Sequence, residues 1–311
     1  MFIGIGEILI DFISMKKGVR VRDSPGFYKF PGGAPANTTV GIARLGYPAG
    51  FITKVGDDEF GYFLVDVLKK NNVDTSQVKY SKEARTALAF VSIDEHGERS
   101  FEFYRHPAAD QLLRPEEISE DYIKRGKMLH FGSVGLAVEP SRSAHLQAIK
   151  YAKKHGLYIS FDPNIRENLW PDPTIMKDVI LDFVKYADIF LPSEEEVITL
   201  FGSIDNCVQT LTKYGVKIIV IKQGARGATA FVERKKIYQP SYKTGVESTV
   251  GAGDAFNAGF LYSLLKGFSI EEALDNGAAC AARVITKKGA MSALPTYEEL
   301  LSFKKEHKHA I

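Results

Sequence analysis

The sequence contains little cysteine, with only Cys207 and Cys280 among its 311 residues. Two thiols are too few for a disulfide framework or a thiolate zinc site, so we expect both to be reduced and structural. Long hydrophobic runs are also missing, because no segment reaches the ~20 apolar residues that a membrane-spanning helix needs. The first residues include neither a basic segment nor a cleavable apolar stretch. We therefore expect a cytoplasmic protein with no membrane partner.

An excess of charge of either sign is equally absent. The 40 Lys and Arg residues nearly balance the 38 Asp and Glu residues, which leaves a formal net charge of +2. Without a strongly basic face, nucleic acid is not expected as a partner. The hydrophobic fraction of 45% and the charged fraction of 25% are ordinary for a folded globular protein. The length suits one large α/β domain or two smaller domains.

Short apolar runs bounded by Gly, Pro or Asp recur along the chain. They cover residues 2–12, 50–54, 87–93, 128–132, 157–162, 188–191 and 217–221. Runs that are apolar at nearly every position are typical of strands buried on both faces. Segments with helical periodicity lie between many of them, at residues 60–71, 139–155, 175–186 and 194–201. This alternation predicts an α/β fold with a parallel sheet covered by helices.

Two stretches interrupt this alternation. Residues 16–31 are short and polar, with several glycines and prolines. Residues 86–106 are typical of a hairpin, in which strands at 86–93 and 99–104 flank a turn at 94–97. We expect the two stretches to combine into a small antiparallel sheet outside the main one.

A small glycine-containing turn, Gly251-Ala252-Gly253-Asp254, directly precedes an apolar helical segment. Backbone N–H groups at a helix N-terminus, together with the helix dipole, form an anion site. Glycine lets the backbone approach a phosphate closely. Asp254 has two interpretations here: it caps the helix, or it acts as a general base that removes a proton from an attacking hydroxyl. The turn alone leaves both open.

A second glycine turn, Gly32-Gly33, also enters a predicted helix, and Asn37 falls in the first turns of that helix. One interpretation is a packing turn with a cap. The other is a polyol-binding edge, where backbone N–H groups and the amide of Asn37 meet sugar hydroxyls. The local sequence does not choose between them.

Polar residues also follow two of the predicted strands. Asp11 lies at the end of the first apolar run, and Asn164 and Arg166 follow the run that ends at residue 162. In open parallel sheets, ligands bind beyond the carboxyl ends of the strands. These three side chains are therefore candidates for one crevice, although an Asp at a strand exit is also a common turn former.

Together, these motifs resemble the ribokinase/PfkB family of sugar kinases. The specific matches are residues 32–37 with 43–46, and residues 251–254 with the helix that follows; the resemblance runs from about residue 6 to residue 290. Within the family, the chain is most similar to fructokinases, through residues 97–110, 132–133, 139–142 and 162–171. The 2-keto-3-deoxygluconate kinases share the Asp-Pro-Asn-x-Arg turn at 162–166 and are the main alternative.

The resemblance implies a single Rossmann-like (ribokinase-like) α/β domain over residues 1–311. Its central, mostly parallel sheet has flanking helices, and a small β-sheet lid is formed by about residues 12–34 and 86–106. ATP would lie over the C-terminal part of the sheet and the sugar under the lid. In many relatives the lid also forms a dimer contact, so a homodimer through the lid is expected.

The resemblance also assigns candidate roles. Asp254 would be the base, and the backbone N–H groups of Gly251, Ala252 and Gly253 would stabilise the transferring phosphoryl group. The sugar-binding candidates are Asp11, Gly32, Gly33, Asn37, Arg105, Asn164 and Arg166. The nucleotide-binding candidates are Lys222, Gly224, Gly227 and Asn276, and Glu196 is the candidate Mg²⁺ residue, acting directly or through water.

The chain departs from the family pattern at two positions. Ser248 stands where the family has an Asp linked to a monovalent-cation site, so potassium activation is not implied. Ser193 stands where the Asn-x-x-Glu motif has Asn, which suggests a weaker or displaced Mg²⁺ site. The implied reaction is ATP-dependent phosphorylation of the primary hydroxyl of a small sugar, D-fructose to fructose 6-phosphate. A noncatalytic sugar or nucleotide sensor is the alternative from another class, and it would not need a base in the 251–254 turn.

Overall fold

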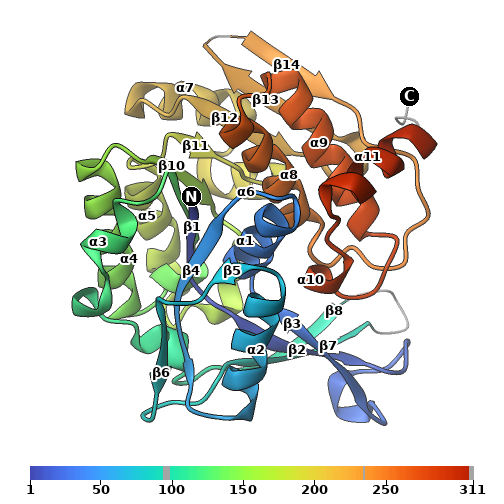
Figure 1. Ribbon diagram of the computed structural model, residues 1–311. Coiled ribbons are helices and arrows are strands. Elements are labelled where there is room, and N and C mark those ends of the chain that lie inside the picture. The colour runs from blue at the N-terminus through green and yellow to red at the C-terminus, as the bar shows by residue number, and fades with distance from the viewer. Residues whose placement is uncertain (94–98, 234, 308–311) are drawn as a thin grey trace.

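The computed structural model describes residues 1–93, 99–233 and 235–307. Within these residues the chain forms a large sheet of ten strands, a separate sheet of four strands, and helices that flank the large sheet (Figure 1). From one edge to the other, the large sheet contains β14 (Lys235–Gln239), β13 (Ala228–Val232), β12 (Ile218–Lys222), β11 (Ile189–Phe190), β10 (Tyr158–Asp162), β9 (Met128–Gly132), β1 (Phe2–Ile5), β4 (Ala49–Gly56) and β5 (Val73–Asp74), and β6 (Val78–Ser81) also pairs with β4.

The large sheet is mostly parallel. All strand pairs from β12 to β5 and β6 are parallel, whereas β13 and β14 continue one edge in antiparallel fashion. Every residue of β1, β4 and β9 is buried, as expected for strands with helices on both faces. The predicted α/β class with a parallel sheet is therefore confirmed.

Two hydrophobic clusters cover the two faces of the sheet. One face carries α1 (Ala34–Arg44), α2 (Glu59–Lys70), α8 (Ala252–Lys266), α9 (Ile270–Val284), α10 (Ala290–Ala293) and α11 (Tyr297–Glu306). The other face carries α3 (Glu120–Ile123), α4 (Ser141–Lys154), α5 (Pro173–Val184), α6 (Glu194–Phe201) and α7 (Ile204–Tyr214). Among the described residues, no helix is both long enough and apolar enough to cross a bilayer.

The apolar run at residues 2–12, predicted as one strand, divides between the two sheets. Residues 2–5 form β1 of the large sheet, and Leu9–Ser14 form β2 of the small one. Gly6 breaks the run with a φ of 147°, and a Cβ there would lie 2.7 Å from Pro35 Cγ. The prediction was wrong because apolar content does not show which sheet buries a residue.

The small sheet has the order β3 (Phe27–Gly32), β2, β7 (Leu88–Ile93), β8 (Arg99–Tyr104). The sheet lies at the lower right in Figure 1, next to α2 and α10. Its outer pairs are antiparallel, but β2 and β7 are parallel, so the predicted wholly antiparallel sheet is corrected to a mixed one. The predicted hairpin strands are present, while the whole predicted turn at 94–97 and its neighbour 98 lie outside the described residues.

The two faces of the small sheet differ. One face turns Leu9, Asp11 and Phe103 toward a cavity under the sheet. The other carries an aromatic cluster in which the rings of Phe12 and Phe90 stack with centroids 5.0 Å apart. This difference follows from the period of two along a strand, which sends neighbouring side chains to opposite faces.

Candidate active site

A cavity of about 380 Å³ opens at the carboxyl ends of the parallel strands, between the large sheet and the small one. Ligands of open α/β sheets bind at this end, so the position itself favours a functional site. Most of the polar and glycine residues of its wall come from β2, the start of α1, the end of β10 and the segment after it, the start of α6, the end of β12 and the turn after it, and the turn before α8. They are Asp11, Gly33, Asn37, Asp162, Asn164, Arg166, Ser193, Glu196, Lys222, Gly224, Gly251, Ala252, Gly253 and Asp254.

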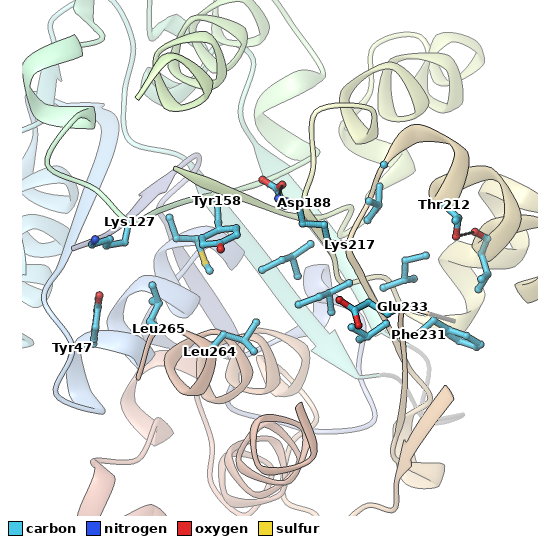
Figure 2. A pocket seen from close by; sticks show the side chains of 18 residues that line it. Tyr47, Lys127, Tyr158, Asp188, Thr212, Lys217, Phe231, Glu233, Leu264 and Leu265 are labelled. Atoms are coloured by element: carbon cyan, nitrogen blue, oxygen red, sulfur yellow. Dashed lines mark hydrogen bonds and ion pairs between the residues drawn. The ribbon is translucent and has the colours of Figure 1, made fainter. Parts of the chain in front are cut away.

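A larger cavity, of about 1040 Å³, lies at the opposite, amino ends of the strands (Figure 2). Its walls are mostly apolar and include Leu264 and Leu265 at the end of α8. At its rim, Lys217 Nζ lies 2.8 Å from Asp188 Oδ1, so these two charges pair with each other. Neither glycine turn contributes to this wall, and the smaller cavity is therefore the candidate active site.

The turn before α8 presents uncapped backbone N–H groups to the smaller cavity. Gly251 is the N-cap of α8 with a φ of 79°, and no side chain caps the helix. A Cβ at Gly251 would collide with Ala290, so both the backbone conformation and the packing require glycine here. The Ala252 N–H donates a long bond of 3.4 Å to the Thr249 carbonyl oxygen, and the helix dipole favours an anion at this end of the helix.

Asp254 does not cap α8, which removes one of its two interpretations. It lies in the first turn of the helix, and its Oδ2 accepts a hydrogen bond of 2.7 Å from Nδ2 of Asn37. Burial raises the pKa of Asp254 to about 6, and the hydrogen bond from Asn37 opposes this shift. The two glycine turns thus meet through one side-chain contact.

Asp11 faces the same cavity from β2. Burial raises its pKa to about 7, the charge of Asp254 raises it further, and the charge of Arg166 lowers it. In this cavity, the carboxyl groups of Asp11 and Asp254 therefore repel each other when both are ionised. Such a pair in a concave site is a functional candidate on physical grounds.

Asp162, Lys222 and Asn257 form a buried cluster whose first and last members the sequence analysis did not assign. Lys222 Nζ donates to Asp162 Oδ2 at 2.8 Å, and Asn257 Nδ2 donates to the same oxygen at 2.5 Å. Lys222 Nζ also lies 3.5 Å from the point that a Cβ on Gly253 would occupy. The cluster therefore places an ammonium group beside the anion-binding turn. The available signal was that Asp162 opens the 162–166 motif and Asn257 follows Asp254 by three residues.

Glu196 is tied into the start of α6. Ser193 Oγ accepts from the Glu196 N–H at 3.2 Å, and Glu196 Oε2 accepts from the Ser193 N–H at 2.7 Å. The other oxygen, Oε1, accepts from the Ile165 N–H at 2.7 Å. Burial, and then the charge of Asp162, raises the pKa of Glu196. Ser193 thus acts as a helix cap. Among the described residues, no group of three or more His, Cys, Asp or Glu side chains is arranged to hold a metal.

Asn164, Arg166 and Gly224 also reach the cavity wall. Asn164 adopts a φ of 38°, and its N–H donates to Asp162 Oδ1 at 3.2 Å. Arg166 donates from Nη1 to the carbonyl oxygen of Ile165 at 3.1 Å and remains exposed. The turn after β10 therefore places a left-handed residue, Asn164, and a long cationic side chain, Arg166, at the site.

Two predicted glycines support the site from behind the wall. A Cβ at Gly32 would collide with Oδ2 of Asp11, so this glycine makes room for that carboxylate. Gly227 has a φ of 98°, and a Cβ there would collide with the carbonyl oxygen of Gln239. Both glycines shape the backbone, and neither lines the cavity.

Two predicted ligand-binding residues are turned away from the cavity. Arg105 is 1% exposed, and its Nη2 lies 2.5 Å from Oδ2 of Asp110. Asn276 is buried between helices, where Nδ2 donates to Ser263 Oγ at 2.9 Å and Oδ1 accepts from Lys304 Nζ at 2.7 Å. Neither lines the cavity, so the structure does not bring them to the expected sugar and adenine positions. Arg105 pairs with a carboxylate five residues away, and Asn276 pairs with side chains 13 and 28 residues away, so burial against these partners explains both differences.

Comparison with known proteins gives one consistent family. The family model described as pfkB family carbohydrate kinase matches residues 2–297. Probable fructokinase-3 of Arabidopsis thaliana is 40% identical over 318 residues, covering 99% of this chain and 92% of the relative. Fructokinase-2 of Oryza sativa subsp. japonica is 42% identical over 315 residues, covering 97% of this chain and 94% of the relative.

Solved structures agree with these relatives. A fructokinase with bound ATP from Xylella fastidiosa has a TM-score of 0.92 at 30% identity, and the match covers 98% of each chain. A double-mutant fructokinase from Vibrio cholerae O395 with bound fructose, ADP and potassium ion has a TM-score of 0.88 at 34% identity, with 97% of each chain covered. A putative ribokinase II from E. coli in complex with ATP and Mg²⁺ has a TM-score of 0.91 at 30% identity, covering 98% of this chain and 99% of that one.

Proposed function

Since the chain belongs to the pfkB family of carbohydrate kinases, we propose that it transfers the γ-phosphoryl group of ATP to the primary hydroxyl of D-fructose and forms fructose 6-phosphate. One observation carries this proposal for the site. Asn37 and Asp254, from the two glycine turns, meet at 2.7 Å beside the uncapped N-terminus of α8. A carboxylate next to an anion site is the arrangement that phosphoryl transfer to a hydroxyl requires.

Asp254 serves as the general base in this proposal. The sugar oxygen forms a bond to the γ-phosphorus, the bond from that phosphorus to the bridging oxygen of ADP breaks, and the hydroxyl proton goes to Asp254. Asn37 occupies Oδ2, which leaves Oδ1 for the hydroxyl. Fixing the carboxylate in this way supplies orientation, a large part of catalysis in phosphoryl transfer.

The backbone N–H groups of Gly251, Ala252 and Gly253 stabilise the negative charge of the phosphoryl group. Lys222 supplies a positive charge beside the same turn, because its amine lies near Gly253 while Asp162 holds it. Gly224 lies on the cavity wall next to Lys222 and belongs to the nucleotide side. The anion site and the base therefore face one small volume.

ATP and Mg²⁺ are the cofactors in this proposal, consistent with the ATP-bound and Mg²⁺-bound relatives. The carboxylates of Glu196 and Asp162 provide the hard oxygen ligands that Mg²⁺ prefers. Both oxygens of Glu196 already accept a backbone N–H, so Glu196 fits a role through water, in keeping with the waters that Mg²⁺ retains. When bound, the ion neutralises charge on the phosphate oxygens.

The charges around the sugar side favour a neutral sugar over 2-keto-3-deoxygluconate. Asp11 and Asp254 face this part of the cavity, and Asn37 is the amide between the two glycine turns. A sugar acid needs a free cation, but Arg105 is buried against Asp110, which leaves Arg166 as the cationic candidate. The carboxylate of a sugar acid would meet Asp11 and Asp254, and like charges in a poorly hydrated site repel each other.

A substrate panel tests the proposal directly. Purified protein is assayed with ATP, Mg²⁺ and each of fructose, 2-keto-3-deoxygluconate, ribose and adenosine in a coupled assay for ADP. We expect the highest kcat/KM with fructose. A higher kcat/KM with the sugar acid would replace fructose by that substrate. Tight sugar binding without turnover would instead favour a sensor.

A further inference from the structure

We propose that Glu7 is a positioning residue of the sugar site, which anchors the first turn of α1 from behind. The proposal rests on the proposed function for the identity of the site. Glu7 is not among the catalytic or binding candidates that the sequence motifs identify. Glu7 lies in the linker between β1 and β2, and therefore between the large sheet and the small sheet.

Glu7 contacts the turn that carries the sugar-binding candidates. It is 4% exposed, and its Oε1 accepts a hydrogen bond of 3.1 Å from the N–H of Ala34, the first residue of α1. Gly33 precedes this residue with a φ of 107°, and a Cβ on Gly33 would lie 2.5 Å from the backbone oxygen of Glu7. Both the side chain and the backbone of Glu7 therefore fix the position of this turn.

The same turn fixes the base. The Asn37 N–H donates to the carbonyl oxygen of Gly33 at 2.8 Å, and the Asn37 amide donates to Asp254 Oδ2 at 2.7 Å. A shift of the start of α1 would thus displace Asn37 and with it the carboxylate of Asp254. Displacements of this kind cost activity because phosphoryl transfer depends on alignment.

A buried ion pair stands beside Glu7. Arg105 follows the end of β8, and its guanidinium binds Asp110 in the turn at Ala109–Leu112, so the pair lies where the chain leaves the small sheet. Burial raises the pKa of Glu7 to about 7, the charge of Arg105 lowers it, and the charge of Asp110 raises it. Arg105 thus favours the ionised form of Glu7, the stronger hydrogen-bond acceptor for the Ala34 N–H.

Several polar atoms of this group are buried without a hydrogen-bond partner among the described residues. They are Glu7 Oε2, Arg105 Nε, Arg105 Nη1 and Asp110 Oδ1. Unpartnered buried polar groups are costly and uncommon, so a cluster of them calls for a functional reason. Glu7 also reaches the cavity wall. The partnered oxygen, Glu7 Oε1, holds the glycine turn against the linker of the small sheet.

Three variants separate geometry from charge. Glu7→Gln keeps an oxygen acceptor for the Ala34 N–H, Glu7→Asp keeps the charge but is too short to reach it, and Glu7→Ala loses both. We expect Glu7→Ala and Glu7→Asp to raise the sugar KM about tenfold, with the ATP KM within about twofold of wild type, from the loss of one charge-assisted hydrogen bond. Glu7→Gln should stay within about threefold of wild type.

Two results would contradict the anchoring role of Glu7. An unchanged sugar KM in Glu7→Asp, or a Glu7→Gln protein as impaired as Glu7→Ala, overturns the anchoring role. Circular dichroism and thermal unfolding show whether each variant folds, and the Gln and Asp pair remains informative if Glu7→Ala does not. Wild-type turnover on the substrate panel is measured first, so a failure of the proposed function is seen separately. Calorimetric sugar affinity gives the same comparison without turnover.

A second measurement distinguishes positioning from direct contact with the sugar. Analogues of the accepted sugar that each lack one hydroxyl are tested with wild type and with Glu7→Asp. Positioning predicts the same fold-loss for every analogue, because the turn is displaced whichever hydroxyls are present. If the loss disappears for one analogue, Glu7 binds that hydroxyl itself and the positioning proposal is overturned.

Discussion

At the scale of the residue, Asp254 is the proposed base and also an acidic side chain near the start of a helix. An acidic residue in the first turn of a helix is ordinary, because it interacts favourably with the helix dipole. Here its side chain instead accepts from Asn37, which is 217 residues away in sequence. That contact orients the carboxylate toward the cavity and not toward its own backbone.

Replacing Asp254 tests the base assignment. Asp254→Asn keeps the size of the side chain but removes the proton acceptor, so kcat should fall by roughly 10²–10⁴-fold, the usual range for loss of a general base. Nucleotide affinity, measured by calorimetry, should stay near wild type. A decrease in kcat below about tenfold with intact nucleotide binding would contradict the assignment.

The pH dependence follows from the same group. Asp254 accepts a proton only when ionised, and its pKa is about 6, with Asn37, Asp162, Lys222 and Arg166 as the groups that act on it. Lowering the pH through this value protonates the base, so kcat/KM should fall about tenfold for each further pH unit. Asp11, with a pKa of about 7, interacts with Asp254, so the acid limb reports the pair.

A pH–rate profile of kcat/KM at saturating ATP measures this limb. The residual activity of Asp254→Asn serves as the control and should lose the tenfold slope. A wild-type profile that is flat down to about pH 5 would be incompatible with a base of raised pKa.

At the scale of the element, the turn before α8 is the segment to which we assign anion binding. Its conformation needs glycine at position 251, where the backbone is left-handed and packed against Ala290. Ser248 at the start of this turn accepts a hydrogen bond of 3.3 Å from the Val250 N–H. The hydroxyl therefore makes a local turn contact at the position where the family has a carboxylate.

Potassium independence is the prediction for this element. Without a carboxylate at position 248, a monovalent cation loses charge compensation, so exchanging sodium for potassium should change kcat by less than about twofold. The steady-state rate in matched chloride salts measures this. Ser248→Asp is the matched variant and should gain potassium activation. Activation of the wild type above about tenfold would contradict the prediction.

The positions of helices and strands were easier to predict than the sheet to which each strand belongs. The helices and the parallel strands follow from periodicity and from runs of buried residues. The split of residues 2–12 and the parallel pairing of β2 with β7 do not, because strand pairing depends on contacts between distant segments. Asp11 was accordingly placed at the exit of the main sheet, whereas it projects from the small sheet.

At the scale of the whole molecule, the small sheet has two faces with different neighbours. One covers the cavity, and the other carries the rings of Phe12, Phe27, Phe90 and Tyr104. Tyr104 is 63% exposed and belongs to β8, an edge strand of the sheet. Exposed aromatic side chains along a sheet edge favour association with another sheet. That residues 1–311 form one domain stays a prediction.

We predict a homodimer through the small sheet. Light scattering coupled to size exclusion should give twice the monomer mass at micromolar concentration, and Tyr104→Asp should shift the protein toward monomer because it puts a charge beside the ring of Phe90. An exposed tyrosine far from this sheet, Tyr238, provides the matched control as Tyr238→Asp. A monomeric wild type, or equal effects of both variants, would contradict this interface.

The sequence by itself determined the local structure and the chemical types at the site. Glycine turns, a helix start after Gly251 and an apolar strand pattern are properties of neighbouring residues, and they suffice to predict the α/β class and the candidates Asp254 and Asn37. Tertiary structure alone decided which candidates meet. It joined Asn37 to Asp254, added Asp162 and Glu7, and buried Arg105 against Asp110. The reason is that burial and pairing are properties of the folded chain: they join Asn37 to Asp254 across 217 residues, and they bury even the nearby pair Arg105 and Asp110 in a way that no local pattern encodes.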